Sequence, residues 1–181
     1  AFTNADVTGQ ASAIASNLTE STTFTLTASN ALGQASEQVS VGVGVPGAGA
    51  IISEFLAINN GGLQDEDGDD SDWIEIFNPG ATPAALAGWF LTDDPGNLAK
   101  WAFPAVSLPI LEYLLVFASN KDRSVAGSEL HTSFKLDGDG EYLALVMPDG
   151  ITVAHAFTPL FPPQQGNVSY GLSGNPPTEG A

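Results

Sequence analysis

The sequence predicts an all-β fold: an antiparallel β-sandwich preceded by a partial β-sandwich or hairpin segment. The main observation is a series of short apolar segments, several of them strictly alternating, separated by Gly, Pro, Asn and Asp. A second is that no segment repeats apolar residues at the helical period. A third is the length of 181 residues with 43% hydrophobic residues, which is enough for one good core, or for one domain and part of another.

Residues 1–45 hold the first predicted strands. "TTFTLTASN" alternates apolar and Thr residues, and "EQVSVGV" alternates in the same way, with "ALGQAS" between them as the turn. A third candidate strand lies around residues 11–18. The apolar face of the hairpin consists of Phe24, Leu26, Ala28, Val39, Val41 and Val43.

This first segment resembles the C-terminal half of a bacterial immunoglobulin-like domain, because "TTFTLTASNALGQAS" is similar to the penultimate hairpin of such domains. Three strands with few large side chains make a thin core. An incomplete sandwich leaves an apolar face and an unpaired edge. We therefore expect the missing strands to come from a neighbouring domain or from another copy of the chain.

The main sandwich is expected at residues 51–172. Residues 46–50, at the end of "GVGVPGAGA", form the linker before it, and the Pro/Gly-rich residues 173–181 form a linker after it. The predicted strands are 51–57, 72–78, 88–93, 100–104, 112–119, 132–136, 141–147 and 151–157.

Period-2 alternation assigns the faces of these strands. It turns Ile74 and Ile76 toward the core and leaves Trp73, Glu75 and Phe77 on the other face. Other pairs that share a face are Trp89 with Leu91, Leu115 with Phe117, and Leu143 with Leu145.

The order and spacing of several motifs resemble one family. "IISEFLAINN", "DWIEIFNPG", "LAGWFLTDD", "KWAFP", "YLLVFAS", "FKLDGDGEYLALVMPDG" and "VSYGL" are similar to a lamin tail domain of the bacterial, secreted type, over about residues 50–172. The resemblance implies an immunoglobulin-like sandwich without a catalytic centre, used as an accessory of large secreted or surface-attached proteins. Its form is most similar to those ahead of a spore-coat-type kinase domain, which would lie beyond residue 181.

The acidic loop "DEDGDDSD" is the candidate metal site. Asp65, Asp67 and Asp69 recur at every second position, the spacing with which a tight loop presents carboxylates to a hard cation, and Gly68 allows the curl. Asp70 and Asp72 supply further oxygens, so calcium is the expected ion. The loop departs from the EF-hand pattern, so we expect it to bind Ca²⁺ weakly, as extracellular calcium-binding modules do.

Alternatives to this calcium site stay open. The loop can also be a solvated acidic turn whose side chains bond local N–H groups. Mutual repulsion among the five Asp residues favours a counter-ion and hence calcium. A weaker candidate is "LDGDGE", with Asp137, Asp139 and Glu141, where a plain hairpin loop is the better interpretation.

Catalysis is not expected. His131 and His155 each occur alone among apolar or strand residues, and neither a Gly-x-Ser-x-Gly elbow nor a phosphate-binding loop is present. The adjacent Asp93 and Asp94 end a strand at a Pro-Gly turn. An alternative function is carbohydrate binding, with the outward-facing Trp73 and Phe77 as a stacking platform. The favoured explanation of these two rings is that a loop or the N-terminal half-domain packs over them.

Charge and composition narrow the partners. A net charge of −17 with four basic residues argues against nucleic acids and anionic membranes, and the absence of Cys excludes a disulfide framework. We therefore expect a non-catalytic structural or adhesion module of a secreted or surface-displayed bacterial protein, stabilised by Ca²⁺. Its partners would be neighbouring domains, another copy of the chain or a cell-surface glycan.

Overall fold

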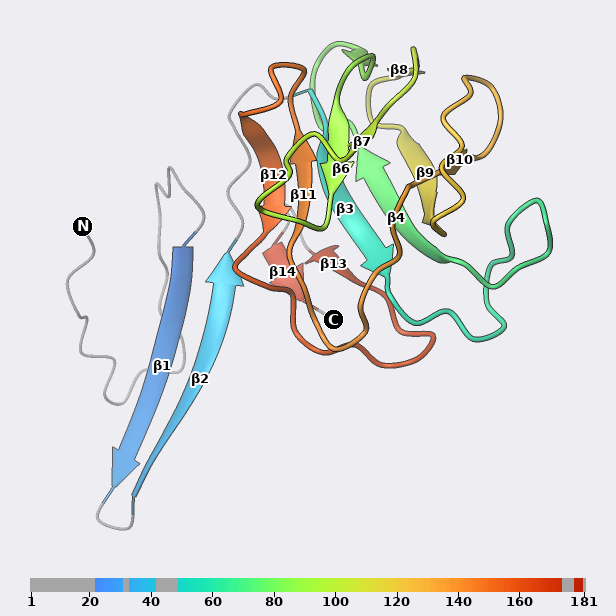
Figure 1. Cartoon of the computed structure of the whole chain (residues 1–181). Helices are drawn as coiled ribbons and strands as arrows, with labels where there is room; N and C mark the ends of the chain where they lie inside the picture. The colour runs from blue at the N-terminus through green and yellow to red at the C-terminus, as the bar shows by residue number, and fades with distance from the viewer. Residues whose placement is uncertain (1–21, 31–32, 42–48, 174–177, 181) are drawn as a thin grey trace.

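A computed structural model describes residues 22–30, 33–41, 49–173 and 178–180 (Figure 1). These residues form strands, turns and loops, so the predicted all-β class is confirmed. Within these ranges no helix is long and apolar enough to cross a bilayer. The strands are β1 (Thr22–Asn30), β2 (Gly33–Val41), β3 (Ile51–Leu56), β4 (Asp72–Phe77), β5 (Ala84–Ala85), β6 (Phe90–Thr92), β7 (Trp101–Ala102), β8 (Ser107–Leu108), β9 (Tyr113–Ala118), β10 (Leu130–His131), β11 (Leu143–Val146), β12 (Val153–Phe157), β13 (Tyr170–Ser173) and β14 (Thr178–Gly180).

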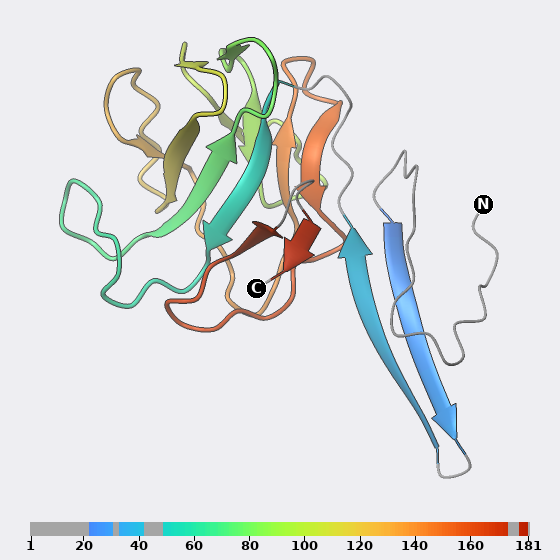
Figure 2. The ribbon, with the colours of Figure 1, turned by 180° about the vertical axis from the view of Figure 1, so that it is seen from behind.

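Two sheets make up the sandwich (Figures 1 and 2). One has the strand order β10-β9-β4-β3-β13-β14, and the other has the order β12-β11-β6-β7. Strands β5 and β8 form a separate two-stranded pair. Nearly all pairings are antiparallel, as alternation and short turns favour, but β10 runs parallel to β9 because a long loop connects them.

The core lies between the two sheets. Ile74 and Ile76 are fully buried, as predicted from the alternation of β4, and Val116 on β9 is buried beside them. From the opposite sheet Leu91, Leu143 and Leu145 enter the same core. Burying each such side chain stabilises the fold by roughly 1.5–3 kcal/mol, which is enough to fix the strand register.

The outer face of the four-stranded sheet carries a second, smaller cluster. Tyr142, Ala144 and Val146 are buried there, and the half-buried Phe90 and Val153 pack against them. Every residue of β11 is therefore buried. The alternation of β11 separates two apolar faces, rather than an apolar face from a polar one.

The structure differs from the predicted elements in three places. A strand was predicted at residues 132–136, but these residues form bends and a bridge. The strand in this part of the chain is β10, which comes just before them and pairs with β9 through two residues. The short β5–β8 pair and strand β13 were not among the predicted strands. Residues 178–180 of the expected C-terminal linker form β14, which pairs with β13.

The N-terminal hairpin was predicted correctly in its two strands. β1 and β2 pair antiparallel in unbroken register from Thr22↔Val41 to Asn30↔Gly33, so β2 begins earlier than the quoted "EQVSVGV". The candidate strand at 11–18 and the linker residues 46–48 lie outside the described residues.

Sheet topology sets the position of the acidic loop. This loop joins β3 to β4 and ends where β4 begins, at Asp72. Asp72 pairs with Ala118, the last residue of β9. The segment that follows β9 therefore starts beside the acidic loop, and the two meet at one end of the six-stranded sheet (Figures 1 and 2).

Candidate functional site

The acidic loop is wound around the carboxylate of Asp65. Its Oδ1 accepts the backbone N–H groups of Asp67 at 3.0 Å and of Asp69 at 3.1 Å. Ser71 Oγ donates to Oδ2 at 2.7 Å. Gly68 has a φ of +82°, a value that a residue with a Cβ rarely adopts, so the predicted curl at this glycine is confirmed.

Buried Asn59 closes the neck of the same loop. Its Nδ2 donates to the carbonyl of Leu63 at 2.7 Å and to the carbonyl of Ser71 at 2.9 Å, and its Oδ1 accepts the N–H of Gly62 at 2.9 Å. One amide side chain thereby satisfies backbone groups at both ends of the loop.

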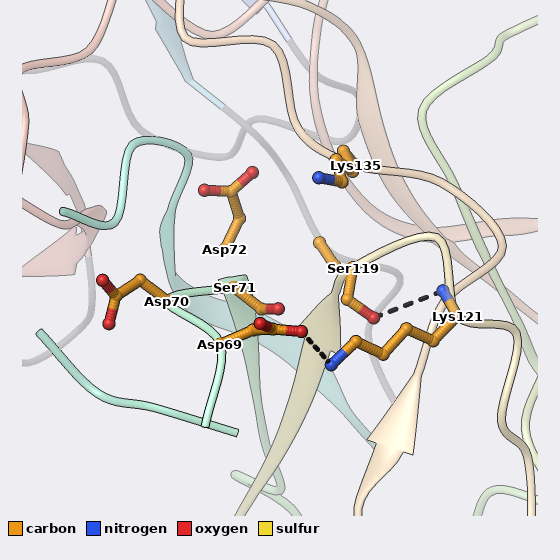
Figure 3. Close-up of a pocket in the computed structure, with 8 residues that line it drawn as sticks. Asp69, Asp70, Ser71, Asp72, Ser119, Lys121 and Lys135 are labelled. Carbon is orange, nitrogen blue, oxygen red and sulfur yellow. Dashed lines mark hydrogen bonds and ion pairs between the residues drawn. The ribbon is translucent and has the colours of Figure 1, made fainter. Parts of the chain in front are cut away.

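Lys121 supplies the positive charge at the centre of the site. Its Nζ lies 2.7 Å from Asp65 Oδ2, 2.7 Å from Asp67 Oδ2 and 2.8 Å from Asp69 Oδ2. Figure 3 shows the side chain extending from the segment after β9 toward Asp69. The three carboxylates offer oxygens that all lie within 4.8 Å of one another, which is why one ammonium can bind all three.

Arg123 and Glu129 add a second set of contacts from the same segment. The Arg123 guanidinium pairs with Glu66 Oε1 at 2.8 Å and with Asp67 Oδ2 at 2.8 Å. Glu129 Oε2 accepts the backbone N–H of Glu66 at 2.6 Å. The acidic loop is thus bound to the β9–β10 segment along much of its length.

These contacts shift the acid–base equilibria of the site. Burial alone would raise the pKa of Asp65, but the bonds from Lys121, Ser71 and two backbone N–H groups outweigh it and hold that pKa well below its usual range. Bonds from Lys121 and Arg123 lower the pKa of Asp67. Burial acts to lower the pKa of Lys121, and its bonds to the aspartates raise it above the usual value.

Asp70 and Asp72 are not brought into this cluster. Asp70 is exposed and accepts a 3.2 Å bond from Gln64 Nε2. Asp72 lies at the start of β4, where its Oδ1 accepts the N–H of Asn59, and burial raises its pKa to about 6. The sequence predicted one site made of all five aspartates. In the structure the carboxylates of Asp65, Asp67 and Asp69 lie together, and those of Asp70 and Asp72 do not join them.

A polar hollow of about 410 Å³ lies beside the lysine (Figure 3). Its lining residues are Asp69, Asp70, Ser71, Asp72, Ala118, Ser119, Lys121 and Lys135. Carboxylates line one side and the two lysines line the other, so the hollow suits water, ions and small polar groups rather than apolar ligands.

His131 lies under the β9–β10 segment. Its ring is fully buried and stacks on Phe117 at 5.4 Å, and its Nδ1 is 2.8 Å from Ser119 Oγ. The Glu66 and Glu129 carboxylates are 3.9 and 4.0 Å from Nε2, beyond hydrogen-bond distance. A Ser–His–carboxylate relay is therefore incomplete, and burial lowers the pKa of His131.

The two residues predicted for carbohydrate binding lie on the outward face of β4. Trp73 and Phe77 are half-buried there. Phe77 stacks on Tyr113 of β9, with ring centroids 4.6 Å apart and planes at 23°, and Tyr113 is 57% exposed. The exposed ring of this face is thus Tyr113, which alternation alone did not single out.

The "LDGDGE" segment forms a turn. Asp137 Oδ1 accepts the N–H of Asp139 at 2.9 Å, and Glu141 Oε1 accepts the N–H of Asp137 at 2.8 Å. Gly140 has a φ of +101°. The carboxylates of Asp137 and Glu141 bond the backbone of the turn. The predicted hairpin loop is wrong, because the segment joins β10 of the six-stranded sheet to β11 of the four-stranded sheet, and these two strands do not pair.

Sequence reasoning missed Lys121, Arg123 and Asn59. A signal for the two basic residues existed, because half of the four Lys and Arg residues of the chain lie in "NKDR". A loop with five Asp residues needs counter-charge, and so few cations leave few choices. For Asn59 the sequence holds no comparable signal.

Comparison with known proteins gave one result. A family model, the Lamin Tail Domain, matches residues 45–158, which is more than half of the chain. A search of the curated proteins found no match, and a search of the solved structures found none. The matched range covers β3 to β12 and includes the acidic loop and the β9–β10 segment.

Proposed function

Since this chain belongs to the lamin tail domain family, we propose that it is a non-catalytic structural module of a secreted or surface-displayed bacterial protein, where it holds neighbouring domains or chains. The family supports a structural rather than a catalytic role. The net charge of −17 suits a soluble, highly solvated protein surface.

One observation supports the structural role most directly: the reactive groups of the site are engaged with one another. Lys121 binds three carboxylates, and Asp65 accepts bonds from two backbone N–H groups, a hydroxyl and an ammonium. Groups held in this way fix the loop to the sheet. A catalytic group, by contrast, must be free to meet a substrate.

Limited proteolysis with a Glu-specific protease tests this role at Glu66. We expect cleavage there to be slow in the folded chain, because Arg123 and Glu129 hold the residue, and to become fast in Arg123→Gln. Generic ester and phosphate substrates should give no turnover. Rapid cleavage of the unmodified chain, or turnover that Ser119→Ala removes, would contradict the proposal.

Calcium binding is a second part of the proposal. Three carboxylate oxygens within 4.8 Å of one another and the curl at Gly68 favour a hard cation. Calcium would have to displace the Lys121 ammonium from all three carboxylates, which lowers the net affinity. We expect a higher melting temperature in millimolar CaCl₂ than in EDTA, because a ligand that binds only the folded state stabilises it. Equal melting temperatures would count against calcium.

Carbohydrate binding is the alternative function, and the exposure of Tyr113 beside Phe77 favours it. Sugar rings stack on exposed aromatic faces of this kind. Binding to cell-surface polysaccharides should then be lost in Tyr113→Ala and reduced in Trp73→Ala, with circular dichroism unchanged. Flat titrations of the unmodified chain would exclude this alternative.

Completion of the N-terminal hairpin by another chain or domain is a further part of the proposal. The pair β1–β2 forms a sheet of two strands, and isolated hairpins are marginal in water. Strand addition from a second copy would enlarge it. Light scattering should then show association that deletion of residues 1–45 abolishes. A monomer at all concentrations would argue against strand donation.

A further inference from the structure

Three titratable side chains lie at one end of the four-stranded sheet, and two of them, Lys100 and Asp93, are in contact. In this sheet β6 lies between β11 and β7 and runs antiparallel to both. Asp93 directly follows β6, Lys100 directly precedes β7, and Glu141 lies two residues before β11. The strand order therefore places Asp93 between the segments that carry Lys100 and Glu141.

The contact between two of them is close and shielded from water. Lys100 Nζ lies 2.5 Å from Asp93 Oδ1, and the two side chains are 28% and 12% exposed. The ammonium also lies over the ring of Phe134, 5.2 Å from its centroid. The contact joins Nζ to a carboxylate oxygen, so attack on Cγ needs only a small movement of the amine over the same carboxyl group. Reacting groups held together in this way can reach effective molarities of about 10⁵–10⁸ M in well-oriented cases.

Glu141 is the nearby group that can give and take protons: the charges of Asp93 and Lys100 both act on its carboxyl, whose Oε1 accepts the backbone N–H of Asp137. Its own carboxyl is half-buried, and burial together with the charges of Asp93 and Asp137 raises its pKa to about 7. A substantial fraction of Glu141 is therefore protonated at neutral pH. A carboxyl that both gives and takes protons near pH 7 is well suited to proton transfer.

From this arrangement we propose that Lys100 and Asp93 condense to an intramolecular amide, with Glu141 as the proton-transfer group. The Lys100 ammonium first gives a proton to the Glu141 carboxylate, and Glu141 passes it to a carboxyl oxygen of Asp93. The neutral Nζ then attacks Cγ of Asp93. The Nζ–Cγ bond forms and one Cγ–Oδ bond breaks. The departing oxygen leaves as water with two hydrogens that came from the ammonium, so no oxidant or co-reactant is needed. The product joins the start of β7 covalently to the end of β6.

Intact-mass spectrometry of the denatured full chain tests the proposal. We expect a mass lower than that of the sequence by one water molecule, and full mass in Lys100→Arg, which keeps the positive charge. Asp93→Asn should lose one ammonia instead, because an amide releases ammonia when an amine displaces it. In the unmodified chain trypsin should also fail to cut after Lys100, while it cuts after Lys121.

Two outcomes would overturn the crosslink. Full mass in the unmodified chain means that Lys100 and Asp93 form an ion pair only. A loss of water that persists in Lys100→Arg means that it arises elsewhere, for example by cyclisation at Asp149–Gly150. Glu141→Gln is expected to keep full mass over the time in which the unmodified chain reacts, and reaction at an equal rate would remove Glu141 from the mechanism.

Discussion

Replacing Lys121 by Met removes the charge at the centre of the acidic loop and keeps a side chain of similar length. The Asp65 side chain is fully buried, so the substitution leaves an unpaired carboxylate out of contact with water. Removing one partner of such a pair costs about 3–5 kcal/mol. Asp67 and Asp69 are 39% and 64% exposed. Because solvent screens these two carboxylates, losing their ion pairs with Lys121 adds little to the cost.

The remaining bonds to Asp65 reduce this cost. Two backbone N–H groups and Ser71 Oγ still donate to its carboxylate. We therefore expect Lys121→Met to lower the free energy of unfolding by about 2–3 kcal/mol. For a domain of this size the melting temperature should fall on the order of 10 °C.

Thermal unfolding followed by circular dichroism in EDTA measures the effect. Lys135→Met is the matched control, because Lys135 lines the same hollow but binds none of the three clustered aspartates. It should melt within a few degrees of the unmodified chain, and calcium should restore part of the stability of Lys121→Met. If Lys121→Met melts like the unmodified chain in EDTA, the assignment of Lys121 as the counter-ion is wrong.

Three further predictions concern other parts of the sandwich. Gly140→Ala should destabilise the fold by at least about 1–3 kcal/mol in urea unfolding, because φ is +101° and a Cβ would lie 2.4 Å from the Phe161 carbonyl oxygen; an unchanged midpoint would refute this. Asn59→Ala should cost about 1–3 kcal/mol, measured in the same assay, because three hydrogen bonds are lost. The pKa of Asp72 is raised from 3.8 to about 6 and that of Glu141 from 4.5 to about 7, so the folded state binds these protons more tightly. Protonation of each carboxyl stabilises the fold fully at a pH below its ordinary pKa, 3.8 for Asp72 and 4.5 for Glu141. This stabilisation is lost as the pH rises through about 6 for Asp72 and about 7 for Glu141. Melting temperature should depend less on pH across this range in Asp72→Asn and Glu141→Gln, and identical profiles would contradict the prediction.

Much of the fold was predictable because alternation is a local property. In β4 the charge of Glu75 defines the outer face, and Ile74 and Ile76 follow as core residues. The same reasoning fails where neither face is solvated. β11 is buried on both faces, so its alternation does not reveal which residues join the main core. Strands of two residues, such as β5 and β10, are too short to carry a pattern.

The candidate site was predictable in its carboxylates and not in its cations. The spacing of Asp65, Asp67 and Asp69 indicated convergence, and the structure brings these three together. The prediction assumed that the repulsion among them had to be relieved by a metal. Lys121 lies more than fifty residues away in sequence, and local spacing gives no information about such a partner.

The sequence by itself determined the all-β class, the inward face of the longer strands and a loop that concentrates negative charge. Each of these depends on neighbouring residues, since alternation sets the faces and spacing sets the curl. The tertiary structure decided which side chains neutralise that charge and which carboxyl groups lie beside an amine. The pairing of Asp72 with Ala118 brings Lys121 to the loop, and the position of β6 between β11 and β7 brings Lys100 to Asp93. Such neighbours depend on strand order, which long-range packing fixes after the local pattern has formed.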